Sequence, residues 1–151
     1  MRALIQKVST SNVVVDEENI GEINAGLLVL LGVGREDGTE DRDWLIKKIT
    51  QLRIFEDAEG KMNLSNEDIQ GGYLVISQFT LYGSTKKGNR PSFIDAAPPD
   101  VAEEQYIDFL TALGDKVGHD RVKKGKFGAY MKVGLINEGP VTIWLDTKNK
   151  Q

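Results

Sequence analysis

Apolar and polar positions alternate in short runs over much of the chain, which predicts strands separated by turns. Residues 27–33 differ, because they form an uninterrupted apolar run bounded by glycines, as in a strand covered on both faces. We expect this strand to be central in a sheet. The other predicted strands cover residues 1–7, 13–16, 20–23, 53–55, 73–78, 131–137 and 141–146.

Two further segments show helical spacing. Thr39 fits an N-cap for a helix over 40–52, and Pro98-Pro99-Asp100 opens a second helix that Gly114 is expected to stop. The inward stripes consist of Trp44, Leu45, Lys48, Ile49 and Leu52 in the first helix, and of Val101, Ala102, Tyr106, Phe109, Leu110 and Leu113 in the second.

Strands outnumber helices, so the pattern predicts the α+β class. We expect a single domain over 1–151 with a curved, largely antiparallel, barrel-like sheet and two main helices. In this scheme the last two strands form a pair that is joined by Glu138-Gly139-Pro140.

Composition and charge narrow the function classes. Hydrophobic residues make up 40% and charged residues 28%, as in ordinary soluble domains, and no apolar run approaches the roughly 20 residues that cross a bilayer. The amino terminus lacks the apolar core of a signal peptide and cysteine is absent, so we expect a cytoplasmic protein without membrane contact. A net charge of -4 argues against DNA binding over a whole face, and any nucleic-acid contact should be local.

Several common catalytic chemistries are excluded by residue type. His119 is the only histidine and lies in a polar stretch typical of a solvated loop, so cysteine nucleophiles, histidine-based triads and Cys/His zinc sites are not expected. Gly32-Val33-Gly34 lacks the third glycine of a dinucleotide fingerprint, since Asp37 stands there. We therefore expect no metal and no cofactor.

Polar side chains appear where an apolar strand ends, at Ser77, Gln78 and Thr80. Pockets gather polar groups at strand ends, although these hydroxyls could equally serve only to bond the backbone. Two lysine-rich loops present a similar choice between phosphate binding and simple solvation. Their candidate phosphate-binding residues are Lys86, Lys87, Arg90, Lys123 and Lys124.

Pro140 is unusual at the start of a final strand, because proline lacks a backbone donor there. Gly139-Pro140 is either an ordinary hairpin turn or a cis peptide bond, and the spacing alone does not choose between them.

Six motifs lie along nearly the whole chain: MRALIQKV at 1–8, GLLVLLGV at 26–33, LRIFEDAEGKMNLS at 52–65, SQFTLYG at 77–83, RPSFIDAAPP at 90–99 and NEGPVTIWLDT at 137–147. Together they are highly specific. With them the chain resembles the D-aminoacyl-tRNA deacylases, which hydrolyse the ester between a D-amino acid and the end of a transfer RNA.

The resemblance implies a homodimer. In that family a Gly-cis-Pro dipeptide, here Gly139-Pro140, enters the active site of the other subunit and excludes L-amino acids, while glycyl-tRNA is also cleaved. Such exclusion gives specificity because the side chain of an L-amino acid would clash with the dipeptide. The partner motif is the SQFT stretch, here Ser77, Gln78 and Thr80.

The resemblance also implies how catalysis proceeds. Backbone amides around Phe79 and Thr80 would stabilise the developing negative charge, and the ribose 2′-hydroxyl of the substrate would assist the attacking water. Phe127, Ala129 and Met131 are expected near the terminal adenine. Lys124 and Tyr130 depart from the residues that are common in the family, which affects the details of the nucleotide pocket.

Two other functions remain open at this point. The first is a deacylase of the same fold that edits an L-amino acid, which a reoriented Gly139-Pro140 would permit. The second is a catalytically silent RNA-binding module that uses the two lysine loops.

Overall fold

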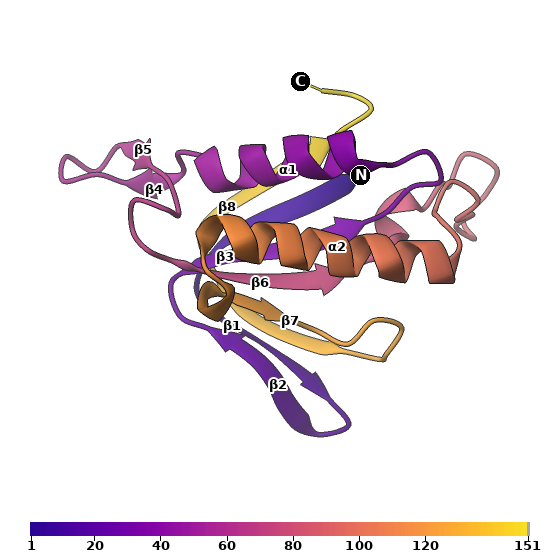
Figure 1. Cartoon of the computed structure of the whole chain (residues 1–151), viewed down its shortest axis with the longest axis horizontal. Helices are drawn as coiled ribbons and strands as arrows, with labels where there is room; N and C mark the ends of the chain where they lie inside the picture. The colour runs from indigo at the N-terminus through magenta and orange to yellow at the C-terminus, as the bar shows by residue number, and fades with distance from the viewer. Residues whose placement is uncertain (151) are drawn as a thin grey trace.

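The computed structural model describes residues 1–150, and in it two helices cover one face of a curved, barrel-like mixed sheet (Figure 1). The predicted α+β class is confirmed. In the main sheet the strand order is β2-β1-β3-β6-β7, and β8 pairs with the free side of β1. The strands are β1 (Arg2–Val15), β2 (Glu18–Ile23), β3 (Gly26–Gly32), β6 (Gly72–Ser77), β7 (Val122–Lys124) and β8 (Lys132–Asp146), with a separate pair β4 (Phe55–Glu56) and β5 (Met62–Leu64).

Strand β3 is central, as its apolar run predicts. Leu27 and Val29 pack into the cluster under the helices, whereas Leu28 packs into a second cluster on the other face. The strand pairs antiparallel with β1 and parallel with β6. Parallel pairs require a crossover connection, and helices α1 (Thr39–Gln51) and α2 (Pro99–Val117) lie in the crossovers β3 to β6 and β6 to β7.

Strand β1 is continuous, so the prediction of two separate strands at 1–7 and 13–16 was wrong. The polar residues between them stay in the sheet because β8 satisfies them: Ser11 is buried and its Oγ donates to the carbonyl of Gly134 at 2.8 Å. The first half of β1 pairs with β3, the second half pairs with β2, and β8 follows nearly its whole length.

Strand β8 is also continuous, which corrects the predicted pair of strands joined by a turn. Gln6 faces Thr142 and Val8 faces Asn137, so residues 138–141 have no partner in this register and bulge out of the ladder. The bulge contains Gly139-Pro140. It interrupts the strand without reversing it, because both flanks continue to pair with β1.

Both helices are confirmed, with two corrections at their ends. The N-cap of α1 is Gly38, whose N–H donates to Asp41 Oδ2 at 3.0 Å, and Thr39 is already helical. Gly114 lies inside α2 and does not stop it. A Cβ at this position would lie 2.2 Å from Nδ1 of His119, so the glycine leaves room for that ring. The helix ends instead at Gly118, which has a φ of 104°. In residues 1–150 no helix combines the length and apolarity that a membrane span needs.

Candidate functional site

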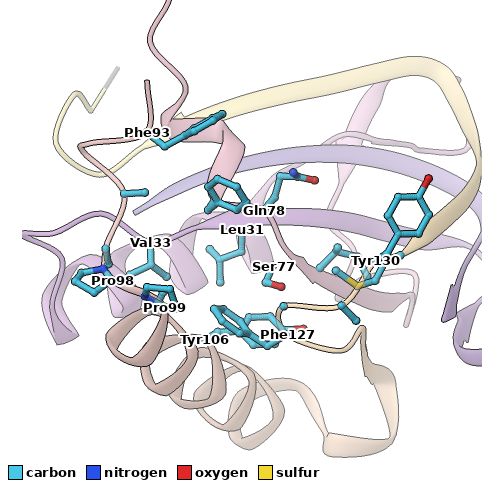
Figure 2. Close-up of a pocket in the computed structure, with 18 of the residues that line it drawn as sticks. Leu31, Val33, Ser77, Gln78, Phe93, Pro98, Pro99, Tyr106, Phe127 and Tyr130 are labelled. Carbon is cyan, nitrogen blue, oxygen red and sulfur yellow. The ribbon is translucent and has the colours of Figure 1, made fainter. Parts of the chain in front are cut away.

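A cavity of about 740 Å³ opens at the carboxyl ends of the parallel strands β3 and β6 (Figure 2). Leu31 and Ile76 lie at the strand ends, and the first turns of α2 and the segment after β7 form the opposite wall. The lining is mostly apolar, with Arg35 as its one charged side chain among residues 1–150.

One wall of the cavity is an aromatic pair. Tyr106 of α2 lies against Phe127 with ring centroids 5.9 Å apart, as Figure 2 shows. The Tyr106 hydroxyl donates to the carbonyl of Val75 at 2.7 Å. Burial raises the pKa of Tyr106 to about 12, against a smaller opposing effect of the Gly125 backbone, so the phenol stays neutral.

Two polar residues of the predicted SQFT motif, Ser77 and Gln78, lie at one corner of the cavity. Ser77 points into it and Gln78 lies beside it (Figure 2). The Gln78 side chain donates to the hydroxyl of Thr80, so Thr80 bonds a side chain rather than only backbone. Thr80 itself does not line the cavity.

Phe79 begins the short 3-10 helix η1 (Phe79–Tyr82) directly after this corner. Its ring is 56% exposed and meets Phe93 edge to face, with centroids 5.0 Å apart. The first N–H groups of a helical turn have no partner within that turn. The amides of Phe79 and Thr80 therefore have no backbone acceptor within η1.

Side chains from other parts of the fold hold helix η1 in place. Arg2 donates to the carbonyl of Leu81 at 3.0 Å and its guanidinium lies 4.3 Å from the ring centre of Tyr82. The Tyr82 hydroxyl donates to Asp37 Oδ2 at 3.1 Å. Burial, and then the charge of Asp37, raises the pKa of Tyr82 far above its ordinary value. The amides of η1 are thus fixed in position rather than carried on a free loop.

The segment from Gly125 to Met131 forms the wall across from Ser77. Phe127, Ala129 and Met131 all line the cavity, as the resemblance implies. Met131 packs closely against Gly125 at its base, because a Cβ there would stand 2.5 Å from the sulfur of Met131.

Gly139 and Pro140 are joined by a cis peptide bond, which the spacing of the sequence left undecided. Both residues are exposed, and neither lines the cavity of its own chain. Asn137 donates to the hydroxyl of Thr142 at 2.9 Å across the base of the bulge. The dipeptide therefore projects from the surface on a bulge whose base is closed by this hydrogen bond.

The lysine-rich segments are exposed and lie outside the cavity lining. Lys86, Lys87 and Arg90 belong to a loop that is closed by the bridge between Ser84 and Ser92, just before Phe93 of the cavity. Lys123 and Lys124 belong to strand β7, so their placement in a loop was wrong, and they come just before the Gly125 to Met131 wall. Each basic segment thus leads directly into a different side of the cavity.

Sequence reasoning missed several wall residues. Tyr106 was assigned only to the helical core, and Phe93, Ala96 and Ala97 were given no role although the RPSFIDAAPP motif contains them. The signal was the run of small residues and prolines before α2, since small side chains leave room beside a helix start. Within residues 1–150, no three His, Cys, Asp or Glu side chains are grouped to hold a metal ion.

Known proteins match this chain over nearly its full length, and the matches agree with one another. Residues 4–146 match the family model described as D-Tyr-tRNA(Tyr) deacylase. A D-aminoacyl-tRNA deacylase of Fusobacterium nucleatum is 56% identical, covering 99% of this chain and 97% of that protein. One of Thermotoga petrophila is 53% identical, covering 97% of each.

Two solved structures share the architecture. A protein titled c-Myc DNA Unwinding Element Binding Protein superposes with a TM-score of 0.93 and 43% identity, covering 97% of this chain and 98% of that one. A probable eukaryotic D-amino acid tRNA deacylase superposes with a TM-score of 0.82 at 19% identity, over 95% of this chain and 97% of that one. The second likeness shows the fold alone.

Proposed function

The chain belongs to the D-Tyr-tRNA(Tyr) deacylase family, and we propose that it hydrolyses the ester between a D-amino acid and the 3′ end of transfer RNA. One observation carries the proposal. Ser77, Gln78 and Phe79 converge with Phe127, Ala129 and Met131 on a single cavity, although about 50 residues separate the two groups in sequence.

The apolar wall suits the terminal adenine. Phe127, Ala129 and Met131 offer an aromatic ring, a small side chain and a sulfur, which are the contacts that suit a splayed base. The volume of about 740 Å³ lies within the roughly 300–1,000 Å³ of small-molecule sites, so one aminoacyl nucleotide is an appropriate occupant.

The amides of Phe79 and Thr80 supply the catalytic electrostatics. When water attacks the ester carbonyl, negative charge develops on the carbonyl oxygen, and preorganised N–H donors stabilise that oxygen in the transition state. The support of η1 by Arg2 and Asp37 keeps these donors in place without reorganisation. The Thr80 hydroxyl has a positioning role, since it accepts a bond from Gln78.

The attacking water must lose a proton, and no carboxylate, histidine or cysteine of residues 1–150 lines the cavity to accept it. The 2′-hydroxyl of the terminal ribose is adjacent to the ester: it accepts a hydrogen bond from the water and relays a proton to the departing 3′-oxygen. The reaction then needs no cofactor or metal from the protein.

Chirality is read by Gly139-Pro140 of a second subunit in a homodimer. The dipeptide projects from its own chain and lies outside its own cavity, which is the arrangement that donation in trans requires. Its backbone carbonyls would occupy the space of an L side chain, whereas a D side chain points outward. Glycyl-tRNA has no side chain to exclude and is also a substrate.

Mixing two inactive variants tests donation in trans. Gly139→Val places a side chain at φ 110°, with its Cβ 2.7 Å from Val141 Cγ2, and Phe79→Pro removes an amide from the cavity. After random exchange of subunits, half of the dimers are mixed and each contains one intact site, so about a quarter of wild-type activity returns. Activity that stays absent in verified mixed dimers would place the dipeptide in its own subunit's site.

A panel of charged transfer RNAs tests the substrate class. D-tyrosyl-tRNA and glycyl-tRNA should be deacylated and L-tyrosyl-tRNA spared. Preference for the L form would replace the proposal with an L-editing deacylase. If none is cleaved while Lys86, Lys87, Lys123 and Lys124 are all needed to bind RNA, the silent RNA-binding module is correct.

The basic segments contact phosphates of the transfer RNA in this proposal. Lys86, Lys87 and Arg90 lie on one side of the cavity, and Lys123 and Lys124 lie on the other. Local charge of this kind is compatible with a net charge of -4, whereas DNA binding over a whole face is not. The proposed place of action is the cytoplasm, where charged transfer RNA is used.

A further inference from the structure

Tyr130 is 85% exposed, although it lines the same cavity as its inward-pointing neighbours. Figure 2 places its ring at the rim, with Phe127 deeper in the cavity. A bulky aromatic side chain that is left in water at the mouth of a site is available to a partner, because its burial by that partner removes apolar surface from water.

The backbone that carries Tyr130 is fixed. Gly128 has a φ of 74° and the N–H of Ala129 donates to the carbonyl of Lys126 at 3.2 Å, which closes a tight turn. Met131 packs against Gly125 at the base of the segment. The ring therefore stands on a rigid support, and a partner loses little conformational entropy by ordering it.

The charge around Tyr130 points to the class of partner. Residues 122–133 contain no acidic side chain, although the chain as a whole has a net charge of -4. Lys126 and Lys132 flank Tyr130 in sequence and are exposed. An exposed aromatic ring among lysines is the combination that holds single-stranded nucleic acid, with the base stacked on the ring and the phosphates beside the lysines.

We propose that Tyr130 stacks on the base of the nucleotide that precedes the terminal adenosine of the transfer RNA. The inference rests on the proposed function, in which the aminoacyl-adenosine fills the cavity beside Phe127, Ala129 and Met131. The preceding nucleotide must then leave over the rim next to this segment, and Tyr130 is its exposed ring. The stack strengthens binding and leaves the chemical step unchanged.

Comparing two substrates tests the stack. For D-tyrosyl-tRNA, Tyr130→Ala should raise KM about 5- to 10-fold and leave kcat unchanged, whereas Tyr130→Phe should behave as wild type. For 3′-O-D-tyrosyl-adenosine, which lacks the preceding nucleotide, Tyr130→Ala should leave KM unchanged. Ile94→Ala is the matched control, since Ile94 is 69% exposed outside the cavity lining and should alter neither substrate.

Removing only the penultimate base completes the cycle. A D-tyrosyl-tRNA with an abasic penultimate nucleotide should show the raised KM with wild-type enzyme and little further increase with Tyr130→Ala. An equal effect of Tyr130→Ala on both substrates would place Tyr130 against the aminoacyl-adenosine. Loss of the dimer in this variant would place Tyr130 at the subunit interface. An unchanged KM for both substrates would show that Tyr130 takes no part in binding. Each of these three results overturns the stack. If wild-type enzyme cleaves no D-tyrosyl-tRNA at all, the proposed function fails instead.

Discussion

Asn137 and Thr142 are joined by a hydrogen bond of 2.9 Å across the base of the bulge that carries the cis Gly139-Pro140 bond. The Thr142 hydroxyl also lies 3.4 Å from the carbonyl of Pro140, to which it donates. One hydroxyl thus links the stem of the bulge to the dipeptide that is proposed to read chirality.

Thr142→Val removes this hydroxyl with little change of shape. We expect the ratio of kcat/KM for D-tyrosyl-tRNA over L-tyrosyl-tRNA to fall about 3- to 10-fold, because an exposed hydrogen bond of this kind contributes roughly 0.5–1.5 kcal/mol. Thr142→Ser keeps the hydroxyl and should keep the ratio. An unchanged ratio in the valine variant would show that the bulge holds its shape without this link.

Phe79→Pro should lower kcat about 100-fold or more, because it removes one backbone donor at the first position of η1, where proline is sterically accepted. Phe79→Ala is the matched control, since it loses the same ring but keeps the amide. Single-turnover deacylation of D-tyrosyl-tRNA measures the effect. Equal losses in the two variants would assign the effect to the ring rather than the donor.

Thr80→Ala should keep its kcat within about 5-fold of wild type, because the hydroxyl only positions Gln78 while the amide remains. The same deacylation assay applies, together with a check that the dimer is intact. Complete loss of activity in a folded dimer would make the hydroxyl a direct participant in the reaction.

Tyr106→Phe should lower the free energy of unfolding by about 1 kcal/mol, since it removes a buried hydrogen bond of 2.7 Å to the carbonyl of Val75. Urea unfolding measures the difference. Tyr130→Phe loses a hydroxyl from an 85% exposed side chain and should leave stability unchanged. If the two variants unfold at the same urea concentration, the buried bond contributes nothing net.

The loss of folding stability at acid pH should depend on Asp41. Burial opposes ionisation, but bonds from Thr147, Lys148 and the Gly38 amide outweigh it and lower the pKa of Asp41 from 3.8 to about 2. A depressed pKa in the folded state stabilises the fold above pH 4 and loses this effect as the pH falls from 4 to 2. Asp41→Asn should therefore cost about 1 kcal/mol at pH 7, since solvent screens part of the effect. The difference from wild type should vanish near pH 2 in urea titrations.

The sequence predicted those elements that the local pattern of residues determines. The uninterrupted run of β3 and the helices α1 and α2 are local signals, and they were confirmed. Within the predicted inward stripes, Lys48 and Val101 were wrong, because both are exposed. The ends of elements depended on distant residues instead. Gly114 does not end α2, and the glycine instead leaves room for the ring of His119. The polar middle of β1 stays in the sheet because the carbonyl of Gly134 satisfies Ser11.

The site residues likewise divide into those that local sequence pattern predicts and those that distant packing brings to the cavity. The polar end of β6 and the Phe127 to Met131 segment were expected at a pocket, and both line the cavity. Tyr106 and Phe93 join them only through the packing of α2 and the loop before it. No periodicity marks such residues, because a pocket wall and a core face have the same apolar pattern.

The pairing of β1 with β8 has a consequence for synthesis on the ribosome. Arg2 pairs with Asp146, so β1 lacks one of its neighbours until residue 146 has been synthesised. Contacts between such distant residues slow folding, and an uncovered edge can meanwhile associate with other nascent chains. Completion of the sheet therefore has to wait for β8.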